Sequence, residues 1–126
     1  MIKLDYFQEF GDGSDAPSLG ESLGVLDPQD RMRIASYLDG GAVVSAVPGY
    51  DKDLLDGSIL GLTGSRHTDG TYVWRHHLKH YVVKYGVGLR EDFVTMVRNG
   101  DKPTADLTAD EIRAAIAFIK SFPRPE

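Results

Sequence analysis

The fold is decided by the stretch HTDGTYVWRHHLKHYVVKYG, residues 67–86. Its Asp69-Gly70 step predicts a tight turn, because glycine readily adopts the positive φ that such turns need. The β-branched and aromatic residues at 71–74 predict a strand, which we expect to form a hairpin with an earlier strand at 58–63. An apolar stripe follows at Leu78, Tyr81, Val82 and Tyr85. Its i, i+3, i+4, i+7 spacing predicts a helix that is capped by Gly86.

Outside this stretch, periodicity and capping signals predict the remaining elements. Strands are expected at 2–7 and 42–47, an acid-rich loop at 50–57, and helices from Asp27-Pro28 to Gly40-Gly41, over 91–99, and after a capping box formed by Thr108 and Glu111. Strands and helices are largely segregated along the chain. We therefore expect an α+β fold, with a small, largely antiparallel sheet of three to four strands and helices packed on one face, in a single domain over residues 1–126.

Composition excludes several classes of protein. The chain has 126 residues, 41% of them hydrophobic, and no cysteine. It can bury a core of its own, and it has no disulfides, thiolate metal sites or cysteine nucleophile. No apolar run approaches the roughly 18–20 residues that span a bilayer, and the early acid Asp5 argues against a signal peptide. We therefore expect a cytoplasmic protein with no cofactor and no membrane partner.

Charge is unevenly distributed around a net value of −5. Residues 1–60 hold eleven acids and four bases, whereas residues 61–126 hold eight acids and ten bases. The acidic N-terminal half repels phosphate backbones and attracts basic proteins. We therefore expect a protein partner and no binding of nucleic acid. The plainer alternative is a solvated acidic face that only keeps the protein soluble.

One acid-rich loop has the composition of a contact surface. Three carboxylates lie beside one aromatic and one aliphatic side chain, which matches an interaction hot spot with a polar rim. The predicted partner-binding residues are Tyr50, Asp51, Asp53, Leu54 and Asp56, with Asp12 and Asp15 as a second site. The alternative is that the loop only joins two strands.

Three histidines form the candidate metal site. His76 and His80 are four residues apart and could share a metal ion on one helix face, with His67 as a third ligand. No Glu lies between the pair as in His-Glu-x-x-His, so the metalloprotease pattern is absent. A solvated helix face is the expected role of this pair. Because no nucleophile or phosphate-binding motif is present either, the sequence predicts no catalytic residues.

The Thr-Asp-Gly turn and aromatic-x-Trp strand at 68–74 lead into the Leu-x-x-Tyr-Val stripe and on to Leu89 and Phe93. Over residues 57–97, this pattern resembles a loose group of small uncharacterised bacterial proteins. Arg75 departs from the pattern, which has proline as the first residue of the helix. The resemblance implies a bacterial context. Small, acidic bacterial proteins without cysteine or a catalytic motif are similar in character to toxin-immunity proteins, which occupy a toxin's active site with acidic and aromatic side chains.

Three hypotheses about function follow. The leading one is a small cytoplasmic protein-binding protein, an immunity protein that blocks a basic toxin domain through its acidic surface. The second is a metal-dependent enzyme or sensor that uses the histidines. The third is a small adaptor or structural subunit with no toxin involved.

Overall fold

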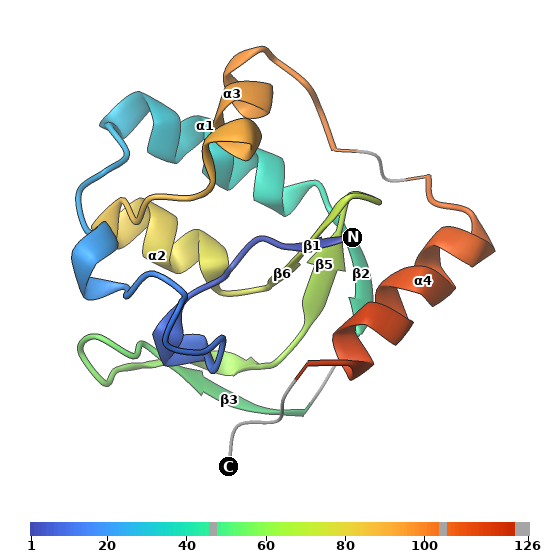
Figure 1. Ribbon diagram of the computed structural model, residues 1–126, viewed down its shortest axis with the longest axis horizontal. Helices are drawn as coiled ribbons and strands as arrows, with labels where there is room; N and C mark the ends of the chain where they lie inside the picture. The colour runs from blue at the N-terminus through green and yellow to red at the C-terminus, as the bar shows by residue number, and fades with distance from the viewer. Residues whose placement is uncertain (46–47, 104–105, 123–126) are drawn as a thin grey trace.

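The computed structural model describes residues 1–45, 48–103 and 106–122, with the side chains of 48–50 and 62–63 outside the description (Figure 1). The strands are β1 (Ile2–Lys3), β2 (Ala42–Ser45), β3 (Pro48–Lys52), β4 (Ile59–Thr63), β5 (Arg66–Thr68) and β6 (Tyr72–Arg75). The helices are α1 (Pro28–Asp39), α2 (Leu78–Tyr85), α3 (Glu91–Arg98) and α4 (Ala109–Lys120), with short 3-10 turns at Gln8–Phe10 and Gly20–Ser22. Within this part of the chain, no helix combines the length and apolarity needed to cross a bilayer.

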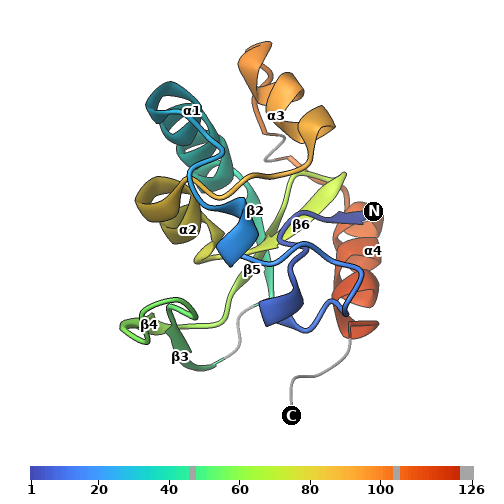
Figure 2. The same cartoon turned by 60° about the vertical axis from the view of Figure 1, so that its left-hand side comes forward.

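The expected α+β architecture is confirmed. Four strands form one sheet in the order β1-β6-β5-β2, in which only the β1–β6 pair is parallel. The other two strands, β3 and β4, form a separate antiparallel hairpin. This hairpin projects below α2 in both views of the molecule (Figure 1, Figure 2).

Helices lie on both faces of the sheet (Figure 1, Figure 2). On the first face, the ring of Tyr72 packs edge-on against Phe93 of α3, and Trp74 lies 6.4 Å from Tyr37 of α1 between ring centroids. Strand alternation points Val73, which is fully buried, toward the second face. There α4 contacts β2. The arrangement therefore has α1, α2 and α3 together on one face, as expected, and α4 as an additional layer on the other.

Local signals at the helix ends act as the sequence predicts. The side chain of Asp27 accepts a hydrogen bond from the amide of Asp30 at 2.8 Å, and Pro28 occupies the first turn of α1. Gly86 ends α2 with φ +61, in the left-handed region. Thr108 and Glu111 form the predicted capping box of α4. These three helix boundaries are thus set by residues within one turn of them.

The strand pairing differs from the prediction. β6 pairs with β5, a strand where the sequence predicts only a turn, while the strand at 59–63 pairs with β3. The β5–β6 hairpin still closes at Asp69-Gly70, where Gly70 has φ +97. The Asp69 carboxylate accepts hydrogen bonds from the amides of Thr71 and Tyr72 at 2.9 and 2.7 Å. This tight turn brings the residues on its two sides close enough to pair as strands.

Three other expectations are corrected by tertiary contacts. The strand expected at 2–7 ends at Lys3, because Asp5 turns inward to accept hydrogen bonds from the amide and guanidinium of Arg75. The expected loop at 50–57 begins inside β3, which runs to Lys52. The spacing of Ile112, Ala115, Ile116 and Ile119 predicts a buried stripe on α4, but of these four only Ala115 is fully buried. The predicted strand end at 46–47 lies outside the described residues, as does Pro123, which the sequence predicts to end this helix.

Candidate functional site

The turn between β3 and β4 is organised by one buried carboxylate. Asp53 is 0% exposed although it stands in a loop. Its Oδ1 atom accepts the amides of Leu55 and Asp56 at 2.8 and 3.1 Å. The backbone closes the same turn, since the Asp53 amide donates to the Ser58 carbonyl at 2.8 Å and the Gly57 amide donates to the Asp53 carbonyl at 2.7 Å. Residues 53–58 are therefore held in one conformation by their own hydrogen bonds.

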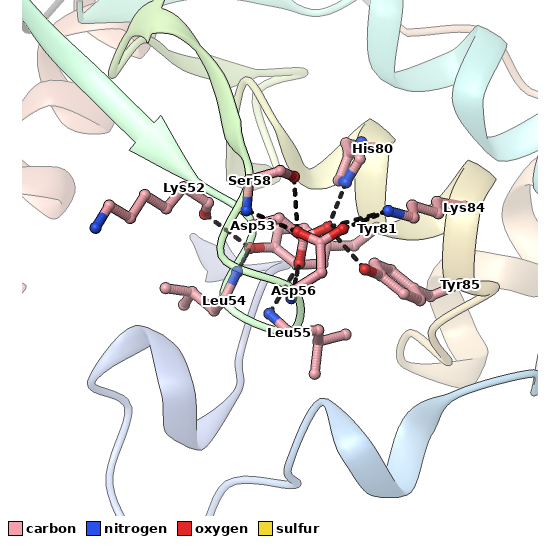
Figure 3. A network of polar contacts seen from close by, with 10 residues as sticks. All are labelled: Lys52, Asp53, Leu54, Leu55, Asp56, Ser58, His80, Tyr81, Lys84 and Tyr85. Carbon is pink, nitrogen blue, oxygen red and sulfur yellow. Dashed lines mark hydrogen bonds and ion pairs between the residues drawn. The ribbon is translucent and has the colours of Figure 1, made fainter.

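The second oxygen of the same carboxylate binds helix α2 (Figure 3). Oδ2 of Asp53 lies 2.7 Å from Nε2 of His80 and accepts the Tyr85 hydroxyl at 2.8 Å. The ammonium of Lys84 is 3.9 Å away. These three side chains share one face of α2, so the helix presents its donors together to the turn.

Tyr81 provides a second link between the hairpin and α2. Its hydroxyl oxygen accepts the Leu54 amide at 2.9 Å and donates to the Lys52 carbonyl at 3.2 Å. The Tyr81 ring is buried in the main core. Through Tyr81 and Asp53, the turn end of the hairpin is attached to α2 by polar contacts (Figure 3).

The electrostatics of the turn favour ionised carboxylates. Burial by itself raises the pKa of Asp53, but hydrogen bonds from His80, the Leu55 amide and Tyr85 outweigh burial and hold that pKa below its ordinary value. The Lys84 ammonium, 2.5 Å from Asp56, and the hydroxyl of Ser58 lower the pKa of Asp56 as well. Both carboxylates therefore carry a negative charge at neutral pH.

The fixed turn leaves a set of side chains facing solvent, which we call the hairpin tip: Asp51, Leu54, Asp56 and Ile59. Leu54 is 46% exposed and Ile59 is 67% exposed, which is high for large aliphatic residues. Asp51 and Asp56, in the same hairpin, are partly exposed as well. The tip thus offers apolar anchors together with carboxylates.

The predicted contact residues divide into three groups. Asp51, Leu54 and Asp56 belong to the hairpin tip. Asp53 does not face outward: it is buried under the turn, so its prediction as a contact residue is wrong, because its carboxylate is used inside the protein. The backbone of Tyr50 lies in β3, and its side chain lies outside the described residues.

The second predicted site, at residues 12–15, is also partly internal. The Asp12 carboxylate binds the ammonium of Lys3 and accepts the Phe7 amide at 3.0 Å, whereas Asp15 is exposed. Other acids of the front half are held in the same way, as the pairs Asp5–Arg75, Asp30–Arg98 and Asp39–Lys79. Within the described residues, much of the acidic charge of the N-terminal half is thus compensated inside the molecule.

The histidines do not converge on one point. His76 precedes α2 and its Nδ1 lies 3.0 Å from Nε2 of His67, whereas His80 binds Asp53. The expectation that His76 and His80 share a helix face is therefore wrong, because the chain is not yet helical at His76. In the described ranges, no group of three or more His, Cys, Asp or Glu side chains could hold a metal ion.

Sequence reasoning missed the pairing of Asp53 with His80. Part of the sequence signal for this pairing is local. An aspartate whose side chain accepts hydrogen bonds from the backbone amides two and three residues later, followed by a glycine such as Gly57, is typical of an Asx turn. The other part is not local, because 27 residues separate the two side chains.

Comparisons with protein-family models, with curated proteins and with solved structures found no match to this chain.

Proposed function

We propose that this chain is a protein-binding protein that docks its hairpin tip onto a partner, and that the partner is a bacterial toxin whose active site it blocks, as an immunity protein does in the cytoplasm of the producing cell. The observation that carries the proposal is the turn fixed by the buried Asp53, which presents the exposed Leu54, with the exposed Ile59 following at the start of β4.

The rigidity of the tip favours binding. Ordering a loop at an interface costs free energy, and a loop that is already held in one conformation avoids that cost. Here the turn is closed by its own hydrogen bonds and tied to α2 through Asp53 and Tyr81. Exposed apolar side chains on such a support are suited to fill a pocket of a partner.

The charge around the tip favours a basic partner. Asp51 and Asp56 lie in the same hairpin as the apolar anchors. Asp56 is paired with Lys84, so the attraction rests on Asp51 and on the net charge of −5 of the whole chain. Carboxylates at the rim of an interface increase the association rate with a positively charged surface more than they increase affinity. Association with a basic toxin domain is therefore expected to slow as salt is added.

A growth-rescue assay tests this function. The gene neighbourhood is first searched for a toxin. The toxin domain found there is expressed in cells with and without the chain, and its affinity for the chain is measured with both purified proteins. Wild type is expected to restore growth and to bind. The double variant Leu54→Asp/Ile59→Asp is expected to lose both properties.

Val43→Asp is the matched control, because Val43 is 61% exposed on β2, away from the tip. It is expected to rescue growth like wild type. Rescue by the double variant at full strength would overturn the tip as the contact surface. A gene neighbourhood without a toxin would overturn the immunity role and favour an adaptor.

A further inference from the structure

A groove of about 710 Å³ runs along the free edge of the main sheet, away from the residues of the hairpin tip. Four parts of the chain supply its walls: the N-terminal segment at 1–7, the segment before α1 at Pro17 and Ser22, the loop before α3, and α4. Its principal lining residues are Ile2, Lys3, Tyr6, Leu89, Arg90 and Phe118. Most of this lining is apolar, and Tyr6 is 44% exposed.

One edge of strand β1 forms backbone hydrogen bonds with β6. β1 is the last strand in the order β1-β6-β5-β2. The amides of Ile2 and Leu4 donate to carbonyls beside and in β6, at Thr71 and Val73, over 2.9 and 2.8 Å. Because backbone groups alternate in direction along a strand, the amide and carbonyl of Lys3 point away from β6, toward the groove.

The groove covers both faces of this edge. Ile2 packs against the main core, on the side of Leu89. Lys3 points to the other face, where its ammonium lies 5.1 Å from the ring of Phe122 and where Phe118 of α4 lines the groove. A strand added at β1 would therefore find apolar surface for side chains on either side of it.

The charged side chains in the lining are both cations. Lys3 and Arg90 stand in the groove, and in the part of the chain that the structure describes no carboxylate lines it. Asp12 and Asp92 hold these two cations from outside the lining. Lys3 is largely buried against Asp12, whereas Arg90 is partly exposed and its partner Asp92 is at the surface. A ligand that combines apolar side chains with a carboxylate can therefore compete for Arg90, whereas a basic ligand meets only cations in the lining.

We propose that the β1 edge is a second docking surface, which accepts an extended apolar and acidic peptide segment of a partner protein as an added strand. The backbone of Lys3 supplies the new hydrogen bonds. Leu89 and Phe118 contact alternate side chains of the peptide. This surface shares no residue with the hairpin tip, so the proposal does not depend on the toxin-binding function.

The probe is a synthetic peptide, acetyl-Glu-Val-Leu-Val-Phe-Glu-amide, titrated into the ¹⁵N-labelled chain. Amide signals of Lys3, Leu89 and Arg90 are expected to shift, and the Lys3 amide is expected to exchange more slowly with solvent. A peptide with the same side chains but N-methylated at every residue has no amide to donate from either edge of a strand, and it is expected to bind at least about tenfold more weakly. A version with Lys in place of both Glu residues is expected to bind more weakly as well.

Two variants at one position isolate the backbone contact. Lys3→Ala removes the ammonium, whereas Lys3→Pro removes the ammonium and the outward amide but leaves the β1–β6 hydrogen bonds in place. We expect Lys3→Pro to bind the peptide about tenfold more weakly than Lys3→Ala. The N-methylated peptide gives the same test on the wild-type chain should the proline variant fail to fold.

Several results would overturn the proposal. Equal binding of the two peptides, or of the two variants where both fold, would mean that the groove takes apolar groups without strand addition. Absence of any shift at millimolar peptide would exclude this ligand class. A stable dimer in sedimentation that the peptide does not dissociate would assign the edge to a second copy of the chain.

Discussion

Replacing Asp53 with alanine removes the side chain on which the hairpin turn depends. The carboxylate accepts four hydrogen bonds, from two amides of its own turn, from His80 and from Tyr85. Removing one partner of a buried, charge-assisted contact costs roughly 3–5 kcal/mol. Leu55, His80 and Tyr85 are only partly buried and can reach water, so we expect the lower part of that range, about 3–4 kcal/mol.

The expected loss is a large fraction of the stability of the domain, which is about 5–15 kcal/mol for proteins of this kind. For a chain of this length it lowers the melting temperature by roughly 11–15 °C. Urea unfolding followed by the fluorescence of Trp74, which is 1% exposed, measures the global change. Hydrogen exchange of the Gly57 amide, which donates to the Asp53 carbonyl, measures local opening of the turn.

Asp56→Ala is the control, because it removes a neighbouring carboxylate that lies at the surface. Its urea midpoint is expected to stay close to that of wild type. If Asp53→Ala unfolds at the wild-type midpoint and keeps slow exchange at Gly57, the carboxylate does not organise the turn. The rigidity argument for the hairpin tip would then fail with it.

Three further perturbations test other parts of the fold. Burial, more than any neighbouring charge, lowers the pKa of His67 below 6.5. Just below that pH, the unfolded chain therefore binds more protons than the folded chain. The free energy of unfolding is expected to rise with pH up to about 6.5. The variant His67→Gln is expected to flatten this rise when urea unfolding is measured between about pH 5 and 7. Gly41→Ala would place a Cβ atom 2.4 Å from the ring of Trp74, and it is expected to lower the free energy of unfolding, measured by calorimetry, by roughly 1–3 kcal/mol. In the control Gly20→Ala, the new Cβ atom meets only a side-chain oxygen at 3.9 Å, so that free energy is expected to stay close to its wild-type value. Thr108→Ala breaks the capping box of α4 and is expected to cost about 1 kcal/mol, with faster amide exchange in its first turn; unchanged exchange there would contradict the assignment.

The secondary structure of the helices follows largely from the sequence, because its signals act over one or two turns. Asp27-Pro28 and Gly86 bound α1 and α2 where their capping chemistry predicts. The buried stripe of α2 follows from its spacing alone. The strands are less predictable, since β5 has only three residues and pairs because the Asp69 turn brings it against β6.

The candidate site shows the same division. The sequence by itself determines that residues 50–57 are acid-rich, contain apolar side chains and end in a glycine, so it indicates where a contact loop is expected. Only the tertiary structure decides that Asp53 is buried as the support of this loop while Leu54 and Ile59 are exposed. The physical reason is that Asp53 meets His80 and Tyr85 across 27 and 32 residues of chain. Neither composition nor periodicity records which donors the packing of α2 brings to a buried carboxylate.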